Sequence, residues 1–175
     1  GKSIKLELDP VEGDKRVRLV GMQQTAPKDL RRLYGMGMYA GKAADVIVKE
    51  LVQNSLDAVK TSLRLGQITE GTITISVDKR DRSISVEDNG IGMSEDVLLN
   101  ALLKPFGTSK VDLPPEESSG GLGQAKQVIL FMPDSIKVET VHKGVLLELT
   151  GTPEQIDTQT AVLTDSKTNL PSGTK

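Results

Sequence analysis

The chain has 175 residues, a formal net charge of −2 and no cysteine. This length suits one domain with a substantial core. The small net charge gives no indication of a nucleic-acid partner or of a membrane surface, and the lack of cysteine excludes disulfides, thiol catalysis and Cys-based zinc sites. No apolar run approaches the roughly 20 residues of a membrane-spanning helix, and the N-terminal residues lack the apolar segment of a signal peptide. We therefore expect a cytoplasmic protein with no membrane partner.

The N-terminal part of the chain predicts three short elements. Short apolar or alternating stretches at 4–8 and 17–22 predict two strands, and Pro27 and Asp29 favour a short helix at 28–34 that is broken by the glycines after it. We treat residues 1–42 as an N-terminal extension that packs on or precedes the main domain.

The main domain is predicted to occupy residues 43–175. It opens with a long amphipathic helix at 43–65, in which apolar residues recur at three- and four-residue spacing. Strong alternation at 72–78 and at 83–88 predicts a β-hairpin, and the acidic start of 94–103 favours another helix.

The second half contains a polar stretch rich in Gly, Pro and Ser at 104–120, which predicts an irregular loop, and a helix at 122–131. Further strands are predicted at 135–141, 144–152 and 157–166, with one more beginning in 170–175. Antiparallel hairpins with helices grouped between them indicate the α+β class, with helices on one face of a mixed, mostly antiparallel sheet.

The first helix carries polar residues on one narrow face. Because an α-helix turns about 100° per residue, Asn54 lies about 40° from Glu50, and Asp57 about 20° to the other side. Apolar residues occupy the opposite side and form the core stripe. Taken alone, this polar face is typical of a solvated helix surface.

A second candidate is the run VEDNGIGM, which ends at Met93. Asp-Asn-Gly is common in turns, and a plain turn is the simplest interpretation. The alternative is a pocket in which the Asp88 carboxylate accepts a hydrogen bond from an exocyclic amine. Gly90 and Gly92 would then let a flat ring approach the backbone, and Met93 would form an apolar wall.

A third candidate is the run SSGGLGQAK, where glycines lead into the helix predicted at 122–131. Backbone N–H groups at a helix start bind anions. The run lacks the Gly-Lys-Ser/Thr of a P-loop and does not follow a parallel strand, as a dinucleotide fingerprint would.

The order of these motifs resembles the GHKL ATP-binding superfamily, which includes gyrase-type topoisomerases, ninety-kilodalton heat-shock chaperones, histidine kinases and MutL. The resemblance covers 43–175 and implies a Bergerat-type sandwich that binds ATP with Mg²⁺. It implies that Asn54 binds Mg²⁺, that Asp88 recognises the adenine amine, and that 104–120 is the ATP lid. The remaining nucleotide-binding residues that it implies are Gly90, Gly92, Met93, Lys110, Gly121, Leu122, Gly123, Gln124 and Thr174, with the Thr152 region as a rival for Thr174.

The resemblance also implies a catalytic role for Glu50. In hydrolysing members, a Glu one turn before the Mg²⁺-binding Asn orients or deprotonates the attacking water. The helix motif looks most like MutL and topoisomerase VI B subunits, whereas the Gly-rich run is nearer to histidine kinases. Three functions stay open: an ATPase that dimerises on ATP binding within a larger protein, a histidine-kinase-like phosphotransferase, and a nucleotide-binding switch with negligible hydrolysis. The client is not indicated, and the single histidine, His142, is expected to be solvent-exposed at a hairpin turn.

Overall fold

The computed structural model describes residues 6–8, 15–21, 43–102 and 133–175. The helix predicted at 28–34, the loop at 104–120 and the helix at 122–131 lie outside the described residues. The strands are β1 (Leu6–Leu8), β2 (Arg16–Val20), β3 (Ile73–Asp78), β4 (Ser83–Asp88), β5 (Ile136–His142), β6 (Val145–Gly151), β7 (Ala161–Lys167) and β8 (Gly173–Thr174). The helices are α2 (Ala43–Arg64), α3 (Glu95–Leu102) and α5 (Pro153–Thr158).

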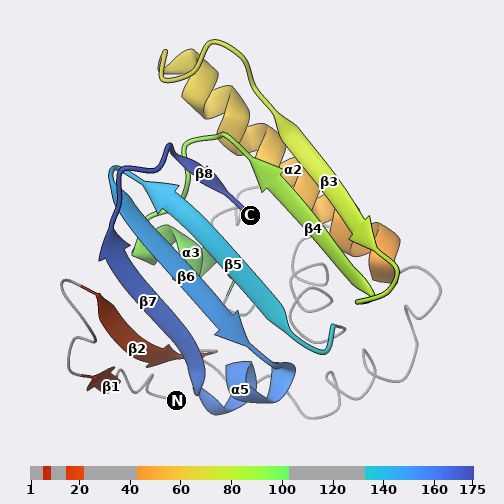
Figure 1. Ribbon diagram of the computed structural model, residues 1–175, viewed down its shortest axis with the longest axis vertical. Helices are drawn as coiled ribbons and strands as arrows, with labels where there is room; N and C mark the ends of the chain where they lie inside the picture. Colours follow the sequence, from red (N-terminus) through yellow and green to blue (C-terminus); the bar gives the residue numbers. More distant parts are fainter. Residues whose placement is uncertain (1–5, 9–14, 22–42, 103–132) are drawn as a thin grey trace, which may run out of the picture.

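The strands form one eight-stranded sheet in the order β1-β2-β7-β6-β5-β8-β4-β3 (Figure 1). Each neighbouring pair among the described strands is antiparallel. The two predicted hairpins, β3–β4 and β5–β6, are confirmed. The short strand β8 lies between them and joins the two parts of the sheet.

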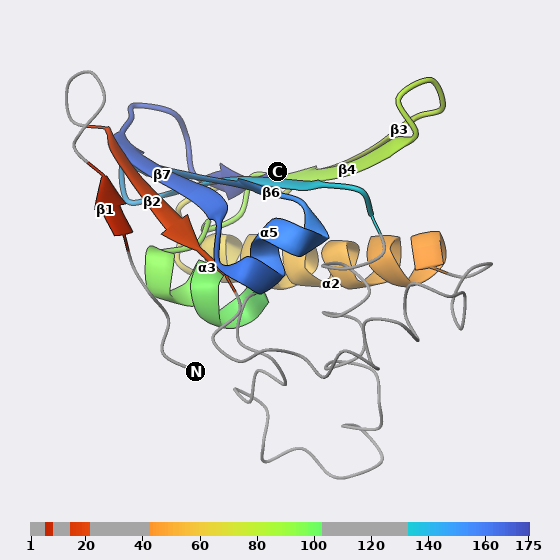
Figure 2. The same cartoon turned by 90° about the horizontal axis from the view of Figure 1, so that it is seen from below.

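The described helices cover one face of this sheet, as Figure 2 shows from the side. The predicted α+β sandwich is therefore confirmed. Its main core lies between the central strands and helices α3 and α5, where Leu98, Leu149, Ile156 and Leu163 are fully buried. None of the helices in the described ranges has the length and apolar character that a membrane crossing needs.

Helix α2 follows the predicted amphipathic pattern. Ser55 and Val59 are buried on the side that faces the sheet, while Asn54 and Asp57 are exposed. Gly66 has a φ of 70°, the left-handed conformation that commonly ends a helix. The apolar stripe thus fixes which face of α2 is left for polar side chains.

Helix α5 differs from the prediction, which had a strand starting at residue 157. Thr152 and Gln155 form a capping box, with the Thr152 side chain accepting from the Gln155 N–H and the Gln155 side chain accepting from the Thr152 N–H. Pro153 occupies the first turn, where its missing N–H carries no penalty. The helix therefore takes residues 157–158, and strand β7 begins only at Ala161.

Two strands of the N-terminal segment belong to the same sheet, since β2 pairs with β7. Arg18 on β2 is buried and forms ion pairs with Glu95, at the start of α3, and with Asp165 on β7. The Arg18–Asp165 pair is 3.0 Å long. These contacts link the N-terminal strands to the helix that follows the Asp88 turn.

Candidate functional site

The turn after β4 holds the predicted Asp88 in a buried position. Asp88 is 8% exposed, and its Oδ1 accepts a hydrogen bond of 2.9 Å from the N–H of Gly90. Within the described ranges, no protein group donates to Oδ2. One oxygen of the carboxylate therefore stabilises the turn that follows β4.

Helix α2 contacts one side of this turn. A Cβ on Gly90 would lie 2.6 Å from the carbonyl carbon of Ala58, so only glycine fits there. The N–H of Ile91 donates to the Ala58 carbonyl oxygen at 3.3 Å. Asn54 and Glu50 precede Ala58 by one and two helical turns. A row of polar side chains therefore runs along α2 away from the Asp88 turn, with Asn54 exposed and Glu50 half-buried.

Strands β5 and β8 hold the other side of the turn. Thr140 on β5 is fully buried, and its Oγ1 accepts a 2.8 Å hydrogen bond from the N–H of Met93. The same oxygen lies 2.8 Å from Oγ1 of Thr174. Thr174 in turn pairs with Asp88 across the sheet. Its rival, Thr152, is the N-cap of α5 instead.

Two residues of this cluster, Thr140 and His142, were not among the predicted site residues. His142 is half-buried and its Nδ1 lies 2.9 Å from the carbonyl oxygen of Ile91, so the expectation of a solvent-exposed side chain is wrong. The hairpin turn itself passes through Lys143 and Gly144, and the His142 side chain points back to the Asp88 turn. Alternation along β5 was a signal for Thr140, because it puts Thr140 on the same face as the core residues Ile136 and Val138.

The described part of the chain contains no group of three or more His, Cys, Asp or Glu side chains that could hold a metal ion. Lys137 on β5 is exposed, and a hydrogen bond to Glu139 together with the charge of Glu139 raises the pKa of Lys137. Lys137 and Glu139 alternate along β5 with Val138 and Thr140, so this pair lies on the sheet face opposite to the Asp88 turn.

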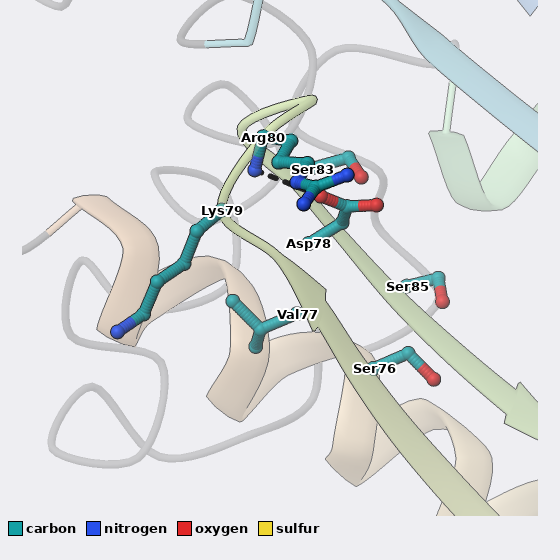
Figure 3. A pocket seen from close by; sticks show the side chains of 7 residues that line it. All are labelled: Ser76, Val77, Asp78, Lys79, Arg80, Ser83 and Ser85. Carbon is teal, nitrogen blue, oxygen red and sulfur yellow. Dashed lines mark hydrogen bonds between the residues drawn. The ribbon is translucent and has the colours of Figure 1, made fainter.

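A shallow hollow of about 570 Å³ lies at the far end of the β3–β4 hairpin (Figure 3). It is lined by three serines and by Val77, Asp78, Lys79 and Arg80. The backbone N–H of Arg80 donates to the Asp78 side chain. Asp88 is at the other end of β4, so this hollow is separate from the predicted site.

The other predicted site residues are distributed as follows. Gly90, Gly92 and Met93 form the turn itself, and Gly92 has a φ of 73°. A Cβ on Gly92 would overlap the carbonyl oxygen of Val141, so the turn packs directly on β5. Those that lie outside the described residues are Lys110, Gly121, Leu122, Gly123 and Gln124.

The buried Asp88 carboxylate thus lies at a glycine turn that contacts the backbone of Ala58 on α2 and strand β5. The family described as histidine kinase-, DNA gyrase B- and HSP90-like ATPase matches residues 42–172. The chain belongs to this family.

Similar relatives are chaperone proteins HtpG. The protein from Mesorhizobium japonicum is 39% identical over 85 residues, which cover 42% of this chain and 13% of the relative. That from Azorhizobium caulinodans is 38% identical over 66 residues, or 33% of this chain and 10% of the relative. That from Idiomarina loihiensis is 33% identical over 88 residues, which cover 45% of this chain and 13% of the relative. The matched segments thus span only a small part of each chaperone.

Proposed function

We propose that this chain is the nucleotide-binding domain of an ATP-hydrolysing protein, with Asp88 as the residue that recognises adenine. The observation that carries this proposal is the buried Asp88 carboxylate, which has one oxygen bound to its own turn and the other without a protein donor among the described residues. An exocyclic amine is a donor of the required kind. Gly90 and Gly92 let the turn pack closely on α2 and on β5, and Met93 adds an apolar surface beside it.

The phosphates of ATP would lie along α2. Asn54 lies one helical turn before Ala58, the residue of α2 that contacts the Asp88 turn. The polar face of α2 thus extends away from the proposed adenine position, toward where the phosphates would lie. Mg²⁺ in phosphate sites takes few ligands from the protein and most of its oxygens from phosphates and water. Asn54 would supply one oxygen from its side-chain amide. Lys110, Gly121, Leu122, Gly123 and Gln124 remain the proposed phosphate-binding residues.

Glu50 is proposed as the group that orients or deprotonates the attacking water. It lies one turn beyond Asn54, so both side chains can face the same terminal phosphate. Bound Mg²⁺ would neutralise charge on the phosphates, and the chain itself supplies positioning. A carboxylate at this position favours hydrolysis over transfer to a protein histidine, which makes the kinase-like alternative second. The third alternative, a nucleotide-binding switch with negligible hydrolysis, differs from the proposed ATPase only in the rate of ATP hydrolysis.

ATP binding is proposed to close the segment 104–120 over the nucleotide and to promote dimerisation within a larger protein. The support is the family membership and the similarity to chaperone proteins HtpG, of which the chain matches a small part. A cytoplasmic location and a downstream domain or protein client belong to the same proposal.

Binding of Mg-ADP by the Asp88→Asn variant tests the adenine assignment. Asn can keep the Oδ1 contact with Gly90 but replaces Oδ2 with an NH₂ donor, which opposes the adenine amine. A hydrogen bond to a charged group contributes about 1.5–3 kcal/mol, so the dissociation constant measured by calorimetry should rise at least about tenfold. Glu87→Gln is the matched control, because Glu87 is exposed on the same strand. Equal ADP affinity of Asp88→Asn and the parent would refute the assignment.

A further inference from the structure

Strand β5 holds the Asp88 turn at three consecutive residues. Thr140 accepts from the N–H of Met93, the carbonyl of Val141 faces Gly92, and His142 contacts the carbonyl of Ile91. The side chains of Thr140 and His142 leave the same face of the strand, as alternation requires. The turn from Ile91 to Met93 is therefore seated on β5 by two side chains with a backbone contact between them.

The donor and the acceptor in the contact of His142 with Ile91 can be assigned. A carbonyl oxygen only accepts, so Nδ1 of His142 must carry the hydrogen and donate it at 2.9 Å. The neutral ring with hydrogen on Nδ1 and the charged ring both meet this requirement, whereas the neutral ring with hydrogen only on Nε2 does not. A Cβ on Gly92 would come within 3.3 Å of the Cβ of His142, so the base of the side chain also lies against the turn.

The peptide units around Ile91 are thus fixed from two sides. The Ile91 N–H donates to Ala58 on α2 over 3.3 Å, which is long for such a bond, and the Ile91 carbonyl accepts from His142 over 2.9 Å. The His142 bond is the shorter of the two. Rotation of the Ile91–Gly92 peptide would break it and would change the path of the turn that follows Asp88.

We propose that His142 is a positioning residue for the nucleotide site: its Nδ1–H fixes the Ile91–Gly92 peptide and so keeps the Asp88 turn ready for the adenine ring. The proposal rests on the proposed function in its use of adenine. His142 acts through Ile91 and makes no contact with the nucleotide itself. A turn that is already ordered costs less to bind than one that must be ordered by the ligand.

Three substitutions of His142 separate this role from simple packing. His142→Asn carries an NH₂ group on Cγ, where the ring carries Nδ1, and retains the donor. His142→Gln carries its NH₂ group one bond further out, near the position of Nε2, and loses the donor while filling similar volume. His142→Ala removes both the donor and the side-chain volume. All three are made in the full chain, and denaturant unfolding reports their global stability.

Two readouts are measured. Amide hydrogen exchange of Gly90, Ile91 and Met93 without nucleotide reports the turn itself, and calorimetry with Mg-ADP reports binding. His142→Gln and His142→Ala should raise the exchange rates and the ADP dissociation constant by about five- to tenfold, the effect of one hydrogen bond. His142→Asn should stay within about twofold of the parent in both.

Equal losses in the Asn and Gln variants would reduce His142 to a packing residue and overturn the proposal, as would parent-like exchange in His142→Ala. If His142→Ala does not fold, the comparison of Asn with Gln still decides. If the parent binds no ADP, the proposed function fails, whereas the exchange rates of the turn still test the role of His142.

Discussion

Replacing Gly92 by alanine should destabilise the chain more than the same change at Gly66. The two glycines have nearly the same backbone conformation, with φ of 73° and 70°. An alanine in that region costs about 1–2 kcal/mol through crowding of its Cβ by its own backbone. At Gly66 nothing else lies within 4 Å of the added Cβ, so this local cost is the whole effect.

At Gly92 the added Cβ also overlaps the carbonyl oxygen of Val141. Backbone atoms of β5 are fixed by pairing with β6 and β8, so the turn itself must move. Overpacking of this kind costs a further 1–3 kcal/mol or so. We therefore expect Gly92→Ala to lower the free energy of unfolding by about 2–5 kcal/mol, against about 1–2 kcal/mol for Gly66→Ala.

Urea unfolding of the parent and both variants measures the difference. With a denaturant slope of about 1–3 kcal/mol per molar, the midpoint of Gly92→Ala should fall by about 0.7–5 M. Its Mg-ADP affinity should fall as well, because displacement of the turn carries Asp88 with it, whereas Gly66→Ala should bind as the parent does. Equal midpoints for the two variants would refute the reasoning that the turn packs rigidly on β5.

The remaining predictions concern single side chains of the site. Glu50→Ala should slow ATP hydrolysis in the full-length protein by a factor of about 10² to 10⁴ and leave ADP affinity within about twofold; a parent-like rate in a steady-state ATPase assay would leave Glu50 as an ordinary helix residue. Asn54→Ala should remove the effect of Mg²⁺ on nucleotide affinity, seen by titration with and without EDTA, and a variant that still responds to Mg²⁺ would show that the ion is bound elsewhere. Thr174→Val removes the hydroxyl that contacts Thr140 at 2.8 Å and should lower the free energy of unfolding by about 1 kcal/mol, with Thr150→Val as the comparison because Thr150 is exposed on β6; a stability unchanged from the parent would mean that the Thr140 contact contributes nothing.

Local patterns in the sequence were sufficient for α2 and for the two main hairpins. The three- and four-residue spacing in α2 and the alternation in β3 to β6 are properties of short windows. Helix α5 was missed although its signal was also local. The order Thr152, Pro153 and Gln155 is that of a capped helix start, but the β-branched residues that follow favoured a strand.

Contacts between segments that are distant in the sequence could not be predicted from short windows. Asp88 and Thr174 were both named from their motifs, but their pairing across β4 and β8 and the supporting side chains of Thr140 and His142 follow from the strand order. That order depends on how β8 inserts between β4 and β5, which no short window encodes. The burial of Arg18 between Glu95 and Asp165 has the same origin, because β2 pairs with β7 from the other end of the chain.

The insertion of β8 has a consequence for the order of events during protein synthesis. The hairpins β3–β4 and β5–β6 are complete before Gly173 and Thr174 are made, yet β8 is the strand that pairs with both β4 and β5. Ribosomes deliver the chain from its N-terminus at about 5–20 residues per second. The sheet around Asp88 can therefore close only after β8 has emerged from the exit tunnel, which is later than the synthesis of the two hairpins that β8 joins.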